Sequence, residues 1–117
     1  MFTHINICRV FSLLLYLFIS NDTIISSSGP VNTHLVIWRG ATVTITGDMT
    51  FTNGSKVIVD GGSTLHLVGG TLNNIILLPQ SGSTVILENN AKIFHNTATS
   101  FLFPTGATMN INYGQIQ

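Results

Sequence analysis

The hexad Gly62-Ser63-Thr64-Leu65-His66-Leu67 recurs in related form three more times in this sequence of 117 residues. Each copy reads glycine, small residue, threonine, aliphatic residue, any residue, aliphatic residue. The glycines that open the copies are separated by 22, 20 and 24 residues. A period of this length indicates a repeat architecture, in which each unit packs against the next. The other copies are Gly40-Ala41-Thr42-Val43-Thr44-Ile45, Gly82-Ser83-Thr84-Val85-Ile86-Leu87 and Gly106-Ala107-Thr108-Met109-Asn110-Ile111.

Each hexad alternates polar and apolar residues, which is typical of a half-buried strand. In the first copy Val43 and Ile45 point to one face, while Thr42 and Thr44 point to the other. Threonine, valine and isoleucine are stiff at Cβ and suit strands, and glycine every few residues interrupts helices. The hexads therefore predict strands and exclude helix as a competing assignment.

The segments between hexads contain further short apolar runs, separated by Asn and Gly at sites such as Asn53-Gly54 and Gly69-Gly70. These residues tolerate left-handed backbone and favour tight corners. Two or three short strands per interval predict an all-β fold, a parallel β-solenoid of about three to four turns of roughly 20–24 residues. A β-sandwich is the structural alternative, but it gives no reason for Gly-small-Thr to recur in phase.

Stacked hexads would place equivalent side chains in columns that run along the solenoid. Inward columns would form an aliphatic core, and at least three turns are needed before such stacking offsets chain entropy. The outward threonine column would form a structural ladder that supports the sheet. The predicted core columns are Val43, Leu65, Val85, Met109 and Ile45, Leu67, Leu87, Ile111; the predicted ladder is Thr42, Thr64, Thr84, Thr108.

Residues 40–47 and 51–72 resemble the right-handed parallel β-helix repeats of secreted bacterial surface proteins. The resemblance is to exported Bacteroidetes-type proteins and to the pectin-lyase-like superfamily. It covers about residues 35 to 117. It implies a right-handed parallel β-helix and a secreted or cell-surface location. Pectate lyases of this kind use a calcium-binding acid cluster and a catalytic base, and the sequence shows no such constellation.

The first 28 residues have the three regions of a signal peptide. Arg9 precedes an apolar run of about ten residues, which is shorter than the roughly 20 that a membrane span needs. We therefore expect residues 1–28 to be a signal peptide or hydrophobic export segment, and no stable membrane span after its removal. An uncleaved anchor or a core strand is the alternative for the apolar run. The β-solenoid domain is then residues 29–117, which we expect to be incomplete at its C-terminus.

Charged residues make up only 7% of the chain, and four basic residues balance four acidic ones. This composition supplies no field to hold a phosphate backbone, so we expect no nucleic-acid partner. The histidines His34, His66 and His95 lack metal-ligand spacing, and Cys8 has no second cysteine to pair with. The remaining acids after residue 28, Asp48, Asp60 and Glu88, are scattered. We accordingly predict no enzyme activity, no metal and no cofactor.

The sequence favours an exported, non-catalytic β-solenoid scaffold or adhesin-like surface segment. The alternative is a carbohydrate-binding protein, or the N-terminal part of a polysaccharide lyase-like β-helix protein, with Trp38 and Tyr113 as candidate glycan contacts. Trp38 has a second interpretation, in which it closes the apolar stack. Glycans and other surface proteins are the expected partners. Edge-to-edge self-association is also expected, because an uncapped solenoid leaves strand edges unpaired.

Overall fold

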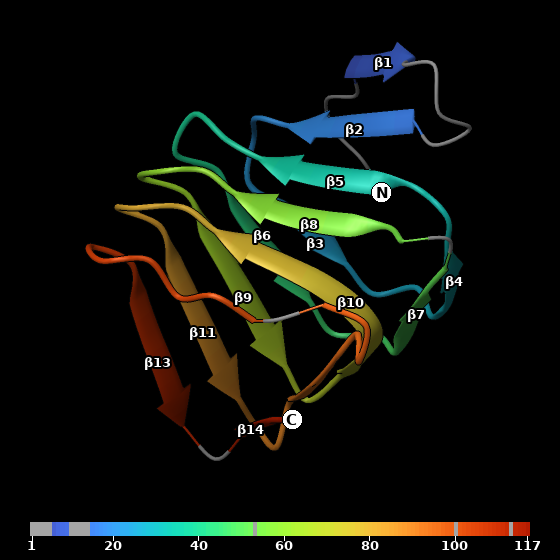
Figure 1. The fold of residues 1–117 in the computed structure, drawn as a ribbon, viewed down its shortest axis with the longest axis vertical. Helices are drawn as coiled ribbons and strands as arrows, with labels where there is room; N and C mark the ends of the chain where they lie inside the picture. Colours follow the sequence, from blue (N-terminus) through green and yellow to red (C-terminus); the bar gives the residue numbers. More distant parts are fainter. Residues whose placement is uncertain (1–5, 10–14, 53, 100, 113) are drawn as a thin grey trace.

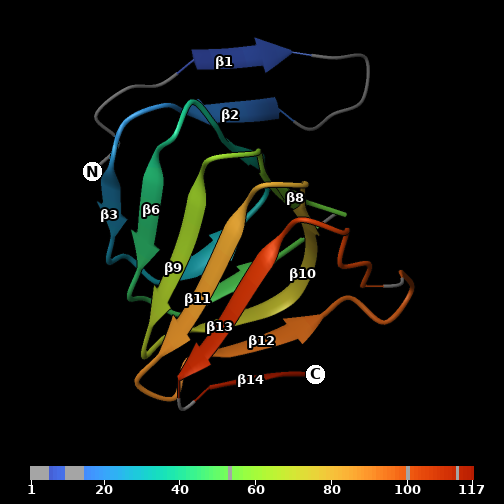
Figure 2. The same ribbon diagram turned by 90° about the vertical axis from the view of Figure 1, so that its left-hand side faces the viewer.

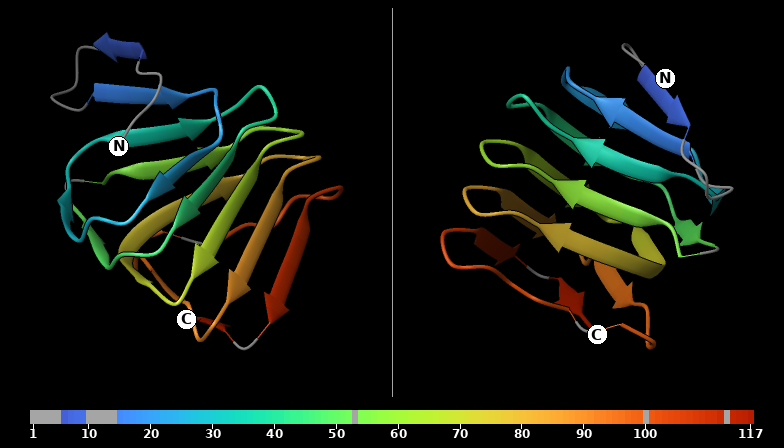
Figure 3. Two further views of the ribbon diagram at one scale, coloured as in Figure 1. Left: turned by 180° about the vertical axis from the view of Figure 1, so that it is seen from behind. Right: turned by 45° about the horizontal axis from the view of Figure 1, so that its top comes forward.

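Short strands recur along the chain, usually three to a coil, and the coils stack into a parallel β-solenoid of about 5 turns (Figure 1). The structure is a computed structural model and describes residues 6–9, 15–52, 54–99, 101–112 and 114–117. Each strand pairs with its equivalents in neighbouring coils, which generates three faces, here called A, B and C (Figure 3). The all-β solenoid predicted from the repeats is therefore confirmed.

The strands of the three faces alternate along the chain. Face A contains β2 (Leu15–Ile19), β5 (His34–Ile37), β8 (Lys56–Val59) and the second half of β10 (Thr71–Pro79). Face B contains β3 (Thr23–Ile25), β6 (Thr42–Ile45), β9 (Thr64–Val68), β11 (Thr84–Glu88) and β13 (Thr108–Asn112). Face C contains β4 (Gly29–Val31), β7 (Met49–Phe51), the first half of β10, β12 (Lys92–His95) and β14 (Gln115–Ile116). One strand, β1 (Asn6–Arg9), lies outside this order and pairs antiparallel with β2.

The solenoid has about 5 turns, whereas the hexads predict three to four. The difference arises at residues 15–31, which form a first coil that the hexad pattern does not mark. β2 pairs in parallel with β5, from Tyr16 opposite His34 to Ile19 opposite Ile37. β3 pairs in the same way with β6. These residues therefore have the role of core strands in the folded chain, and their role in export stays a prediction.

Face B holds the four hexads in the register of their sequence alignment (Figure 2). Thr42, Thr64, Thr84 and Thr108 lie opposite one another in a single outward column. On the inward side Val43, Leu65, Val85, Ile45, Leu67 and Leu87 are fully buried. Met109 is partly buried against this core. The aliphatic residues of successive coils thus form one continuous interior.

Ile111 departs from the inward assignment predicted for it. It pairs in register with Leu87 but is 48% exposed. The reason is its position on the last coil, because no further coil of the described residues covers its side chain. The column to which Ile111 belongs is therefore a core column only through Leu87.

The corner that precedes each hexad is a tight turn with glycine at its third position. The Ser63 N–H donates to the Asp60 carbonyl at 3.0 Å, and the Ser83 N–H donates to the Gln80 carbonyl at 3.0 Å. Gly62 has a φ of +82° in this turn, in the region that glycine adopts without strain. The small residue that follows is buried under the turn in the first three hexads and half-buried in the last, which explains the Gly-small pair at the start of the hexads.

The two ends of the stack differ. Among the described residues, the first-coil end, which carries β2, β3 and β4, is covered only on face A, where β1 pairs with β2. The last-coil end carries β13 on face B and β14 on face C. Within the described part of the chain, no helix is long and apolar enough to cross a membrane.

Candidate functional site

Trp38 lies at the end of β5, at the corner between faces A and B. Its ring packs edge-on against Phe18, with ring centroids 5.3 Å apart. The guanidinium carbon of Arg39 lies 4.3 Å from the ring centroid, in the geometry of a cation–π contact. The indole is half-buried, and its Nε1 is buried with no hydrogen-bond partner among the described residues. These contacts favour the packing interpretation of Trp38 over an open sugar platform.

Tyr113, the second candidate glycan contact, lies outside the described residues, so its side chain is not placed. The predicted threonine ladder is formed by outward side chains of face B, next to a mixed column. That neighbouring column contains Ile24, Thr44, His66, Ile86 and Asn110. The mixture leaves face B with one uniform threonine column, as expected for a ladder that supports a sheet.

The acidic side chains near faces B and C have partners in the protein. Glu88 Oε1 lies 2.7 Å from His66 Nε2, and both side chains are partly exposed, Glu88 by 41% and His66 by 26%. Asp48 Oδ1 accepts a hydrogen bond from the Thr71 N–H at 2.9 Å, and so satisfies a backbone donor at the corner. Within the ranges that the structure describes, no three His, Cys, Asp or Glu side chains group to hold a metal ion.

His34 is the buried histidine of face A. Its side chain is 5% exposed, its ring lies 4.6 Å from the Tyr16 ring, and its Nδ1 accepts the Lys56 N–H at 3.0 Å. An acceptor at Nδ1 requires the unprotonated nitrogen. Burial lowers the pKa of His34 below its usual value of 6.5, and the nearby Lys56 charge lowers the pKa further. The ring therefore serves the folded chain as a neutral hydrogen-bond acceptor.

Face A carries an apolar outward column that sequence analysis did not identify. The strand register places Phe18, Val36, Ile58 and Leu78 opposite one another. These side chains are half-buried, except for Val36, which is 9% exposed. The sequence does indicate this column, because the face A strands are largely aliphatic runs and lack the polar–apolar alternation of the hexads. This column is an apolar ridge on the outside of the solenoid.

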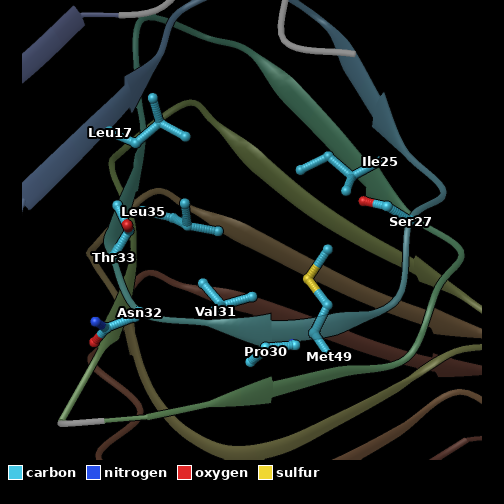
Figure 4. A pocket seen from close by; sticks show the side chains of 9 residues that line it. All are labelled: Leu17, Ile25, Ser27, Pro30, Val31, Asn32, Thr33, Leu35 and Met49. Carbon is cyan, nitrogen blue, oxygen red and sulfur yellow. The ribbon is translucent and has the colours of Figure 1, made fainter.

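An open pocket of about 250 Å³ lies at the first-coil end. Figure 4 shows the side chains of Leu17, Ile25, Val31, Leu35 and Met49 pointing toward one another around it. This first-coil pocket has a simple origin in the register of face C. Gly29 lies opposite Met49 at the top of that inward column, and a Cβ added there would meet no atom within 4 Å. The core column therefore ends in open space lined by aliphatic side chains.

Comparisons with known proteins give no assignment for this arrangement. No protein-family model, curated protein or solved structure matches the chain.

Proposed function

We propose that this chain is a non-catalytic β-solenoid scaffold, an adhesin-like segment that is exported to the cell surface and keeps residues 15–31 as its first coil. The single observation that carries the proposal is the unbroken register of face B. Its columns continue from β3 to β13 with every strand pair parallel. A continuous core of this kind holds distant surface positions at a fixed separation, which is the mechanical task of a stalk.

The outer surfaces support a presenting role. Face B carries one uniform threonine column on its outer side, whereas face A carries the apolar ridge of Phe18, Val36, Ile58 and Leu78. Such contrast between two faces suits a scaffold that contacts other surface proteins through one side. Carbohydrate binding, and membership of the pectin-lyase-like superfamily, stay predictions of the sequence. The contacts of Trp38 with Phe18 and Arg39 do not favour the glycan-binding role.

A spacing measurement tests the scaffold. Ile24 and Asn110 occupy the same outward column, four strand steps apart. At about 4.8 Å per step their Cα atoms are roughly 19 Å apart. Spin labels on Ile24→Cys and Asn110→Cys, in a Cys8→Ser background and diluted with excess unlabelled chain so that only pairs within one copy contribute, are expected to give one narrow distance distribution in pulsed paramagnetic resonance. The pair Thr44→Cys and Asn110→Cys is the matched control and should be shorter by one step. Broad distributions in both pairs would contradict a rigid scaffold.

The location and the N-terminus are tested together. Protein recovered from the surface or medium of the expressing cells is identified by intact mass and N-terminal sequencing. The proposal expects exported protein that still contains residues 15–28. Protein that stays inside the cell would contradict export, and exported protein that begins near Gly29 would contradict retention of the first coil.

A further inference from the structure

The two ends of face B are unpaired strand edges. β3 and β13 are the outermost strands of the five-stranded sheet, and each pairs on one side only among the described residues. Figure 2 shows them at opposite sides of that sheet. Strand edges of this kind are templates for pairing with another chain unless charge, proline or a covering segment blocks them.

At the first-coil end, the backbone of Ile24 points to the free edge. The Ile25 carbonyl accepts the Thr46 N–H at 2.9 Å, so Ile25 directs its backbone groups toward the second coil. Successive residues of a strand direct their N–H and C=O to opposite sides. Within the described residues, Ile24 therefore offers one free N–H and one free carbonyl, and its side chain is 68% exposed.

At the last-coil end, the free backbone groups belong to Met109 and Ile111. The Thr108 N–H donates to the Ser83 carbonyl at 2.9 Å, so Thr108 and Asn110 direct their backbone groups toward the previous coil. By the same alternation, Met109 and Ile111 direct theirs away from it. In the part of the chain that the structure describes, β13 thus offers two free N–H groups and two free carbonyls.

The two edges match in register as well as in direction. If β3 of a second copy took the place of the next strand after β13, Met109 would lie opposite Thr23 and Ile111 opposite Ile25 of that copy. Both Thr23 and Ile25 point inward and are buried. Ile111, which is 48% exposed, would then be covered, and the first-coil pocket would be closed by aliphatic side chains. Burial of these surfaces is the favourable term of the contact.

Faces A and C do not offer the same match at the first-coil end. On face A, β1 occupies the edge of β2. On face C, Gly29 donates to the Asp48 carbonyl at 2.9 Å, which leaves Pro30 facing the free edge. Proline has no N–H, so this edge lacks a donor. Pairing between copies is therefore expected on face B.

Charge does not protect the edges of face B. Residues 15–31 contain one charged side chain, Asp22, and residues 97–117 contain none. Asp22 is already occupied, because its Oδ1 accepts the Thr42 N–H at 2.8 Å. Lysine or another charge at an edge strand is a common protection against pairing, and neither β3 nor β13 contains one.

We propose that β13 of one copy pairs in parallel with β3 of a second copy, so that the solenoids join head to tail. The two surfaces are different patches of the same chain, so each copy keeps one free end after docking. Contacts of this type generate open filaments when the rotation does not close. The filament axis would be the solenoid axis. The inference rests on the first coil proposed above, because β3 belongs to it.

Two proline variants test the pairing at its two ends in the full chain. Ile24→Pro removes a free N–H from the edge of β3, and Ile111→Pro removes one from the edge of β13; neither removes a bond within the chain. The controls Ile24→Val and Ile111→Val keep the N–H and a similar side chain. Sedimentation velocity over a concentration series is expected to show species larger than the monomer for the unaltered chain and both valine variants. Each proline variant alone should lose these species.

Mixing the two proline variants distinguishes blocked docking from failure to fold. Ile24→Pro keeps an intact β13, and Ile111→Pro keeps an intact β3. An equimolar mixture is therefore expected to form a dimer that grows no further, which only folded chains with opposite free ends can do. A monomeric unaltered chain at all concentrations would overturn the proposal, as would filaments of Ile24→Pro alone. Intact mass of the same samples verifies that residues 1–28 are present, which separates failure of this inference from loss of the first coil.

Discussion

At the scale of single residues, the neutral state of His34 links stability to pH. The folded chain holds the pKa of His34 below 6.5, the ordinary value to which the unfolded chain returns. Below that pH the unfolded state binds a proton that the folded state does not, so the free energy of unfolding falls as the pH decreases. Above it, His34 is neutral in both states and its contribution does not change with pH.

The corresponding measurement is urea unfolding at about pH 7.5 and about pH 5, for the unaltered chain and for His34→Gln. We expect the unaltered chain to lose more stability on acidification than the variant. The difference between the two slopes isolates His34 from His66 and His95, which both chains retain. Equal slopes would mean that His34 takes up its proton as easily in the folded protein as in the unfolded one.

Residue patterns predicted the strands of face B, but they carry little information on the surroundings of Trp38. The Gly-small pair encodes a turn with positive φ, as at Gly62, so it marks the start of each hexad strand reliably. Trp38 carries no such local constraint. Its contacts with Phe18 and Arg39 depend on the packing of the first coil against the second, which no local pattern in the sequence records.

At the scale of elements, the alternation of buried and exposed side chains explains which strands could be predicted from the sequence and which could not. β6, β9 and β11 have one buried face, and their period of two was visible. β5 and β10 carry aliphatic side chains on both faces, so they lack this period and their outward column was missed. β2 contains an apolar run that also satisfies the pattern of an export segment, and this ambiguity accounts for the missing coil in the predicted count.

An asparagine corner between faces C and A gives a prediction at this scale. Asn74 has a φ of +58°, its Nδ2 donates to the Phe51 carbonyl at 2.9 Å, and its Oδ1 accepts from Asn96 Nδ2 at 2.8 Å. Asn74→Ala loses both hydrogen bonds and adds backbone strain, whereas Asn74→Gly loses only the bonds. We expect alanine to destabilise the chain by about 1–2 kcal/mol more than glycine in urea unfolding. Equal losses would show that the side-chain bonds, and not the backbone, decide the corner.

At the scale of the whole molecule, the first coil is expected to stabilise the coils beneath it. Ile19 and Ile25 are 1% and 3% exposed, and burial of each contributes on the order of 1.5–3 kcal/mol before chain entropy is subtracted. A chain of residues 29–117 should therefore unfold at a lower urea concentration than the full chain, or fail to fold. If the two chains unfolded at the same midpoint, residues 15–28 would not belong to the cooperative core.

The repetition of face B has a consequence for proteolytic trimming. The Thr64 N–H donates to the Ala41 carbonyl at 2.9 Å, so Thr42 and Thr44 direct their backbone groups toward the first coil. If a peptidase removed residues 1–28, Thr44 would inherit the outward position that Ile24 holds in the intact chain. If the shortened chain folded, the edge of β6 would replace the edge of β3, so that the length of the solenoid and its ability to pair with another copy would be separate properties.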